Sequence, residues 1–195
     1  MQILLASTSP YRKKLLERLR VGFRAVAPGI DETPEPGEGP RDLAARLALA
    51  KARAVAANHP AALVIGSDQV AACGAVLLPK PGGHDAAVRQ LGECSGRAVD
   101  FYTGLALVRI RPAVERVHVE PFRACFRALR RDEIEHYLHR EQPYDCAGSF
   151  KVEGQGIALF ERLQGDDPTS LEGLPLIALS RLLRELGINP LLVDE

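Results

Sequence analysis

The alternation of apolar and polar segments along the chain predicts an α/β protein. A short apolar stretch at residues 2–6 is followed by a helical pattern, with Ser9 as a suitable N-cap. Strand and helix patterns then alternate until two long strand patterns, 99–109 and 116–127, follow each other directly. Helices between strands favour parallel pairing and consecutive strands favour a hairpin, so the expected sheet is mixed.

The other expected elements are bounded by Pro, Gly or polar turns. No repeat, low-complexity segment or strong boundary divides the chain, so residues 1–195 are expected to form a single domain. A buried strand at 63–66 is expected to end at Ser67-Asp68-Gln69. Further strands are expected at 23–27, 76–78 and 157–163, helices at 41–58, 85–91, 132–140 and 175–186, and loops at 28–40 and 148–156.

Composition and charge exclude several classes of protein. The 195 residues are 46% hydrophobic and 26% charged, as in globular proteins, and 25 Lys and Arg balance 25 Asp and Glu. Such a balance gives no global attraction to nucleic acid. No apolar run approaches the roughly 20 residues that span a bilayer, and the four cysteines form no CxxC pair. We therefore expect a cytoplasmic protein with reduced thiols and neither a nucleic-acid nor a membrane partner.

The first strand leads into a segment suited to binding an anion. Ser7 and Ser9 precede a helix whose first turns carry Arg12, Lys13 and Lys14. Cations are unfavourable at the positive end of a helix dipole, so their presence suggests that a negative ligand is expected. Serine hydroxyls and backbone N–H groups could then bind phosphate. The alternative is a capped helix with a solvated basic face.

Acids and lysines elsewhere could complete such a site. Asp68 follows a buried strand, where α/β proteins commonly bind ligands, and could hold a divalent cation or activate water. Glu32 lies in a Pro- and Gly-rich loop, Lys51 lies within an apolar helix stretch, and Lys80 is held between two prolines. Each of these residues alone is as well explained by a turn, a solvated loop or a surface lysine.

Missing motifs narrow the choice of chemistry. The chain has no GxxxxGK[ST], no GxGxxG after a strand and no GxSxG, which argues against P-loop, Rossmann and α/β-hydrolase sites. His136 and His139 lie one helical turn apart without forming HExxH, and are expected to be surface residues.

A set of short motifs resembles the Maf, or septum-formation inhibitor, family of nucleoside triphosphate pyrophosphatases. The motifs follow one another along the chain in the family's order. Each motif alone is weak, but the ordered set spans nearly the whole chain. The matching motifs are Leu4-Leu5-Ala6-Ser7-Thr8-Ser9-Pro10, Asp31-Glu32, Ala50-Lys51-Ala52, Gly66-Ser67-Asp68, Lys80-Pro81, Tyr102-Thr103-Gly104, Ala147-Gly148-Ser149-Phe150 and Gly173-Leu174-Pro175-Leu176.

The resemblance implies an elongated mixed sheet with flanking helices and two lobes around a nucleotide cleft, as in inosine triphosphatases. It also implies a divalent metal, Mg²⁺ or Mn²⁺, hydrolysis of a nucleoside triphosphate to the monophosphate and pyrophosphate, and a homodimer. By position, Asp68 matches the catalytic acid and Glu32 a second acid near the metal. At the positions of the family's cations around the triphosphate, this chain has Arg12, Lys51 and Lys80. In the family's phosphate-facing loop it has Ser7, Ser9 and Lys13.

Base-recognition positions resemble the 7-methyl-GTP pyrophosphatase branch of the family. That branch has an aromatic residue, usually Trp, at the position of Tyr11, Gln at Gln69 and Glu at Glu153, whereas the dTTP/UTP branch has Arg, Thr and Gln at these positions. N7-methylation gives guanine a positive charge, which an aromatic face attracts, and a carboxylate can accept hydrogen bonds from the guanine edge. Two alternatives remain: the same reaction on another nucleotide such as dTTP or UTP, and a nucleotide-binding regulator of cell division without turnover.

Overall fold

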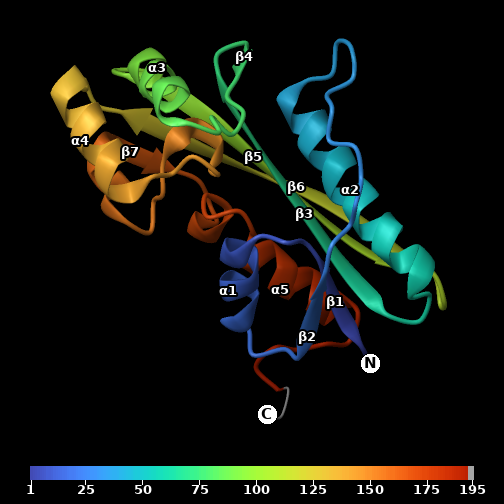
Figure 1. Ribbon diagram of the computed structural model, residues 1–195. Coiled ribbons are helices and arrows are strands. Elements are labelled where there is room, and N and C mark those ends of the chain that lie inside the picture. The colour runs from blue at the N-terminus through green and yellow to red at the C-terminus, as the bar shows by residue number, and fades with distance from the viewer. Residues whose placement is uncertain (193–195) are drawn as a thin grey trace. The chain divides into compact units, whose positions relative to one another are not determined.

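The computed structural model describes residues 1–192, which form two compact units (Figure 1). Unit 1 comprises Met1–Gln69, Thr103–Glu120 and the described residues from Asp167 onward. Unit 2 comprises Val70–Tyr102 and Pro121–Asp166. The chain therefore passes between the units several times, and three of its strands contribute residues to both.

A mixed sheet with the strand order β2-β1-β3-β5-β6-β7 is the framework of the described residues, and β4 pairs with β3. β1 runs parallel to both β2 and β3, whereas the β3–β4 and β6–β7 pairs are antiparallel. This confirms the expected α/β class with a mixed sheet. The strands are β1 (Ile3–Ala6), β2 (Phe23–Val26), β3 (Leu63–Cys73), β4 (Val76–Leu77), β5 (Ala98–Arg109), β6 (Val114–Phe126) and β7 (Phe160–Gln164).

The helices begin and end close to the positions that the sequence predicts. Ser9 caps the first helix and Pro10 is its first residue, as expected. The last helix is followed by Gly187 at a φ of 81°, a left-handed position that favours glycine. The helices are α1 (Pro10–Glu17), α2 (Pro40–Asn58), α3 (His84–Cys94), α4 (Arg131–Glu141) and α5 (Leu176–Glu185), with short 3-10 turns η1 (Ala147–Ser149), η2 (Gln155–Leu159) and η3 (Pro168–Ser170).

Unit 1 buries both faces of its central strands. Alternate residues of β1 point to opposite sides of the sheet, so Leu5 packs with α1 and α5 while Leu4 packs with α2. All four residues of β1 are buried, as is typical of a parallel strand covered by helices on both faces.

Two glycines let α2 lie unusually close to the sheet. A Cβ atom at Gly66 of β3 would overlap the carbonyl oxygen of Ala48, and one at Gly104 of β5 would overlap that of Ala44. Small residues on both sides thus bring helix and sheet backbones together. Because Gly66 and Asp68 are two residues apart on a strand, they share a face, and the residues of α2 beside Ala48 come within reach of Asp68.

Unit 2 has an aromatic core under its own helices. Phe101, Phe126, Phe150 and Phe160 meet edge to face, with ring centroids 4.7–5.9 Å apart. Such packing combines apolar burial with favourable ring electrostatics. Helices α3 and α4 pack against each other, and η1 packs on α3.

One expected boundary is wrong in a way that matters for the site. β3 does not end at Gly66 but continues to Cys73, so Ser67, Asp68 and Gln69 lie in the middle of an 11-residue strand. Polar residues did not end the strand because the fold gives Ser67 and Asp68 buried partners. Two smaller differences are that loop 148–156 contains 3-10 turns and that the strand expected from residue 157 begins at Phe160. None of the helices in the described residues is long and apolar enough to cross a membrane.

Candidate active site

The loop between β1 and α1 is ordered by its own serines. Ser7 is buried, and its Oγ accepts a hydrogen bond from the Ser9 backbone N–H at 3.1 Å. The Oγ of Ser9 accepts from the Arg12 N–H at 3.4 Å. These two N–H groups therefore have partners within the loop. In these contacts both hydroxyl oxygens act as acceptors, so the hydroxyl groups of Ser7 and Ser9 can still donate a hydrogen bond.

Arg12 is held by the distant segment before α5. Its Nε donates to the carbonyl oxygen of Gly173 at 2.8 Å. The same oxygen lies 3.0 Å from the Oγ of Ser67, a hydroxyl that also lies 2.8 Å from the carbonyl oxygen of Gly104. Gly173 has a φ of 108°, a conformation that residues with side chains rarely adopt. One carbonyl thus fixes the guanidinium of Arg12 beside β3.

Lys51 connects the two predicted acids. Its Nζ lies 2.6 Å from Oδ1 of Asp68 and 2.7 Å from Oε1 of Glu32. Lys51 and Asp68 are 5% and 7% exposed, whereas the Glu32 side chain is 54% exposed. Burial excludes the ordinary interpretation of Lys51 as a surface lysine, because a buried ammonium needs a buried counter-charge. The structure brings Glu32, Lys51 and Asp68 together.

The loop that carries Glu32 is attached to the helix that carries Lys51. Arg46 of α2 donates to both carboxylate oxygens of Glu38 at 2.7 Å and to the carbonyl oxygen of Thr33 at 3.1 Å. Asp31 accepts from the backbone and side chain of Thr33 and forms a local turn, and these hydrogen bonds lower the pKa of its carboxyl group. These hydrogen bonds hold the loop in the position from which Glu32 contacts Lys51.

Opposite charges balance within this cluster. Burial lowers the pKa of the Arg12 guanidinium, and the negative charges of Asp68 and Glu32 oppose that shift. Arg12 and Lys51 are thus matched in charge by the two carboxylates. A polyphosphate entering this cluster would need additional positive charge, because the local cations are already compensated.

The two carboxylates fit a hard divalent cation. Oδ1 of Asp68 and Oε1 of Glu32 converge on one atom, the Nζ of Lys51, so both can be directed at a single positive charge. Mg²⁺ is typically held by one or two carboxylates together with substrate phosphates and water. The donor set therefore suits Mg²⁺ or Mn²⁺ bound together with a nucleotide. Lys51 occupies the point of convergence, so a cation would use the remaining carboxylate oxygens or displace the ammonium.

Comparison with known proteins agrees with this arrangement of motifs. The family described as Maf-like protein matches residues 2–186. The chain belongs to the Maf family. We therefore interpret the remaining predicted site residues as residues of a Maf protein.

The similarity to named relatives extends over almost the whole chain. A protein named 7-methyl-GTP pyrophosphatase from Nitrosococcus oceani is 56% identical over 185 residues, covering 95% of this chain and 93% of its own. Proteins of the same name from Polaromonas sp. and Colwellia psychrerythraea are 53% and 49% identical, covering 95% and 97% of this chain and 85% and 94% of theirs. A HAM1 protein structure from Coxiella burnetii shares the fold, with a TM-score of 0.54 at 16% identity, covering 95% of this chain and 99% of its own.

Hydrogen bonds of its amide group fix the orientation of the Gln69 side chain. Its Nε2 donates to the carbonyl oxygens of Ser170 and Leu171 at 2.7 and 3.1 Å, and lies 3.3 Å from Oγ1 of Thr103. A glutamine side chain without other partners could offer a nucleobase both a donor and an acceptor. The structure instead engages the donor within unit 1 and leaves the carbonyl oxygen as the group to accept a hydrogen bond.

The other predicted residues are divided between the units. Tyr11 is half-buried at the start of α1, and Lys13, two residues further on, is exposed. Lys80 and Glu153 are exposed residues of unit 2. The roles of these four residues in the Maf site remain predictions.

Lys80 has a well-anchored backbone despite the proline before it. The carbonyl oxygen of Pro79 accepts from Nε2 of Gln90 at 2.9 Å, and the Oε1 of Gln90 accepts from the Ser149 hydroxyl. The N–H of Gly82 donates to the carbonyl oxygen of Tyr144 at 3.0 Å. Two of the family motifs in unit 2 are therefore joined through Gln90, a residue that the motif analysis missed because no chemistry marks it in the sequence.

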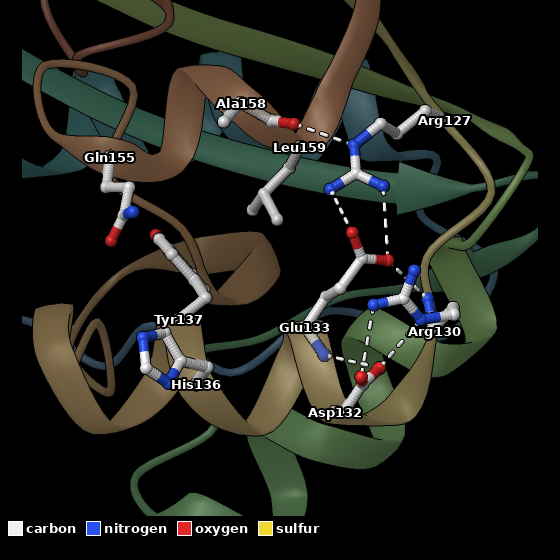
Figure 2. A pocket seen from close by; sticks show the side chains of 9 residues that line it. All are labelled: Arg127, Arg130, Asp132, Glu133, His136, Tyr137, Gln155, Ala158 and Leu159. Carbon is white, nitrogen blue, oxygen red and sulfur yellow. Dashed lines mark hydrogen bonds and ion pairs between the residues drawn. The ribbon is translucent and has the colours of Figure 1, made fainter.

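A separate cavity in unit 2 is a poor triphosphate site. Figure 2 shows the cavity, of about 420 Å³, beside α4 and η2. Its arginines are already paired: Arg127 with Glu133 at 3.0 Å and Arg130 with Asp132 at 3.0 Å. A polyanion here would have to compete with these carboxylates. The lining residues are Arg127, Arg130, Asp132, Glu133, His136, Tyr137, Gln155, Ala158 and Leu159.

Sequence reasoning missed the supporting role of Ser67 and Gly173. Both belong to motifs of the family, but their residue types alone suggest only a turn or a small core residue. Their shared contact joins positions 106 residues apart. A contact of that separation has no local signal in a single sequence.

Proposed function

We propose that this protein hydrolyses 7-methyl-GTP to 7-methyl-GMP and pyrophosphate. The observation that carries the proposal is the buried Lys51–Asp68 pair with Glu32, in a chain that is 56% identical to a protein named 7-methyl-GTP pyrophosphatase. In this reaction a water molecule is added across the bond between the α- and β-phosphates. The water attacks the α-phosphorus, the bridging oxygen leaves with pyrophosphate, and the water oxygen ends on 7-methyl-GMP.

Asp68 is proposed to position the attacking water and to accept its proton. Lys51 binds Oδ1 of Asp68 and so fixes the plane of the carboxylate, which leaves Oδ2 to accept a hydrogen bond from water. Burial of this pair supports the role, because a general base must be held in a defined orientation near the reacting atom. Lys51 is thereby a positioning residue. When its ammonium moves towards a phosphate oxygen of the substrate, the divalent cation would hold Oδ1 in its place, and Oδ2 would still serve the water.

Charge neutralisation is proposed to come from Arg12, Lys51 and a divalent cation held by Asp68 and Glu32. Phosphoryl chemistry depends mainly on positioning and on stabilising charge at the phosphate oxygens. Because the two carboxylates compensate the two cations, a metal bound with the substrate supplies the extra positive charge. The convergence of both carboxylates on one point supports Mg²⁺ or Mn²⁺ rather than a softer metal.

Recognition of the methylated base is proposed for Tyr11, Gln69 and Glu153. An aromatic ring attracts the cationic 7-methylguanine by about 0.5–2 kcal/mol, depending on desolvation. Gln69 can offer its carbonyl oxygen to a donor on the base, because its amide group is held by Ser170 and Leu171. Glu153 is expected to accept from the N1–H and the exocyclic amine of guanine.

The decisive experiment measures pyrophosphate release by the purified protein with Mg²⁺ or Mn²⁺. The substrates are 7-methyl-GTP, GTP, dTTP, UTP and CTP. Asp68→Asn should lower turnover by about 10²–10⁴-fold, the usual contribution of a general base. Glu115→Gln is the matched control, because Glu115 pairs with Arg53 at an exposed position of the same unit and should leave turnover unchanged.

Each outcome assigns a different function. Preference for 7-methyl-GTP, with loss of turnover in Asp68→Asn alone, supports the proposal. Preference for dTTP or UTP keeps the reaction but rejects the proposed substrate. Binding of nucleotide without turnover of any substrate would favour a regulator over an enzyme.

The base-reading residues are tested by exchanging all three together. Tyr11→Arg, Gln69→Thr and Glu153→Gln introduce the residues of the dTTP/UTP branch. The triple variant should change the ranking of substrates in kcat/KM while still releasing pyrophosphate. An unchanged ranking would reject the assignment of these residues.

We further propose that the two units act as one cytoplasmic domain and that the protein is a homodimer, which size-exclusion chromatography with light scattering would test.

A further inference from the structure

A cluster of histidine and glutamate lies in unit 2, outside the residues used above. His84 begins α3, and Glu135 and His139 lie four residues apart on one face of α4. Their potential ligand atoms all lie within 4.8 Å of one another. Helices α3 and α4 pack together, so the cluster is formed by two supported elements and not by one mobile loop.

Both ring nitrogens of His84 have polar neighbours. The Tyr144 hydroxyl lies 3.0 Å from Nδ1 of His84 and 3.3 Å from the carbonyl oxygen of Leu138. When the hydroxyl donates to Leu138, its oxygen can accept the Nδ1 proton of His84. In that tautomer the lone pair lies on Nε2 and is available to a metal ion.

Nε2 of His84 faces a carboxylate. It lies 2.7 Å from Oε2 of Glu135, so a proton or a metal ion lies between the two atoms. A proton on Nε2 joins them as a hydrogen bond, and a metal ion that both atoms bind would take its place. The ring of His139 stacks on that of His84 with centroids 4.7 Å apart and brings a third ligand to the same place.

We propose that His84, Glu135 and His139 form a Zn²⁺ site that ties the start of α3 to the end of α4. Two imidazoles and one carboxylate are a common three-ligand set for zinc, with water in the fourth position. Imidazole nitrogens favour zinc over Mg²⁺, so the site differs in its chemistry from the carboxylate pair of unit 1.

The surroundings have the features of a zinc site. The Tyr144 hydroxyl lies 3.0 Å from Nδ1 of His84, and such a second partner typically fixes the tautomer and orientation of a metal-binding histidine. Arg131 lies 3.4 Å from Oε1 of Glu135, the other carboxylate oxygen, and so leaves Oε2 to the metal. Tetrahedral zinc ligands are about 3.3 Å apart, so Nε2 and Oε2 need only a small separation to admit the ion.

Isothermal titration of the metal-free protein with Zn²⁺, in the presence of excess Mg²⁺ to occupy carboxylate sites, tests the proposal. Wild type should bind one equivalent. His139→Ala should weaken binding by at least about 10-fold, and Tyr144→Phe by about 10-fold, the lower end of the effect of losing a supporting residue. His136→Ala is the matched control, because His136 is another exposed histidine of the same helix but lies outside the cluster.

A second readout separates binding from folding. Zn²⁺ should raise the melting temperature of wild type and His136→Ala but not of His139→Ala, since only an intact site joins the helices. Visible absorption bands of bound Co²⁺ should change in His139→Ala and not in His136→Ala. Equal zinc affinity in both variants, or no binding by wild type, would overturn the proposal and leave a hydrogen bond between His84 and Glu135. Pyrophosphate release is not part of this test, so its result is independent of the proposed enzyme activity.

Discussion

Replacing Lys51 by Met tests whether the buried ammonium holds the candidate site together. Met keeps a long side chain of similar bulk and removes only the charge. In wild type the Nζ lies within 2.7 Å of both Asp68 and Glu32. The variant leaves these two carboxylates facing each other without a cation between them.

The expected cost follows from the burial of the two partners. Breaking a buried ion pair typically costs about 3–5 kcal/mol, because one charge is left in a poorly solvated place. Asp68 is 7% exposed and bears this penalty, but Arg12 interacts with it favourably and reduces the loss. Glu32 is 54% exposed and adds about 1 kcal/mol at most. We therefore expect a loss of about 3 kcal/mol.

Thermal unfolding followed by circular dichroism measures this loss. For a chain of this size, about 1 kcal/mol corresponds to roughly 2–4 °C, so the melting temperature should fall by roughly 6–12 °C. Arg53→Met is the control. Arg53 lies on the same helix and meets Glu115 at 2.7 Å, but both side chains are about half exposed, and the pair is expected to contribute about 0–1 kcal/mol.

Addition of Mg²⁺ to the Lys51→Met variant gives an independent check. If the carboxylates converge as described, the metal should replace the missing ammonium and raise the melting temperature more in the variant than in wild type. Equal destabilisation by Lys51→Met and Arg53→Met would refute the reasoning. So would an identical effect of Mg²⁺ on wild type and Lys51→Met.

Two further predictions concern packing and thiol chemistry. Gly66→Ala should destabilise the protein by about 1–3 kcal/mol in denaturant titrations, because its Cβ would overlap the Ala48 carbonyl, whereas Gly92→Ala on α3 has open space and should be neutral or stabilising. Burial raises the pKa of the Cys94 thiol to about 12, so a thiol-specific reagent should label it only on unfolding; rapid labelling of Cys94 in the native protein would contradict this. Buried Cys73 should be equally protected from the reagent. Cys125 and Cys146 are half-buried and should react first.

Local patterns predicted the class of fold and most element boundaries. Ser9 and Pro10 mark a helix start through capping and a fixed φ, and both signals act within a few residues. The buried alternation of Phe122, Ala124 and Phe126 likewise follows from the period of a strand. Such features depend on neighbouring residues and are readable from one sequence.

Features that depend on distant contacts were not predictable in this way. Asp68 was expected after the end of a strand because polar residues usually end buried strands. The strand continues because Lys51, brought close by glycine and alanine contacts between α2 and β3, neutralises the acid. The residue types of the candidate site came from the resemblance, whereas the amide orientation of Gln69 came from carbonyl groups about 100 residues away.

The carbonyl of Gly173 has a consequence for the synthesis of the protein. Arg12, near the beginning of the chain, takes its place only when this oxygen, near the end, is available to bind it. A nascent chain on the ribosome can complete β1 and α1 early, yet the guanidinium of Arg12 has no anchor until Gly173 has been synthesised. The activity proposed here would therefore require synthesis to pass Gly173, and fragments that stop before it would be inactive even when they retain both carboxylates.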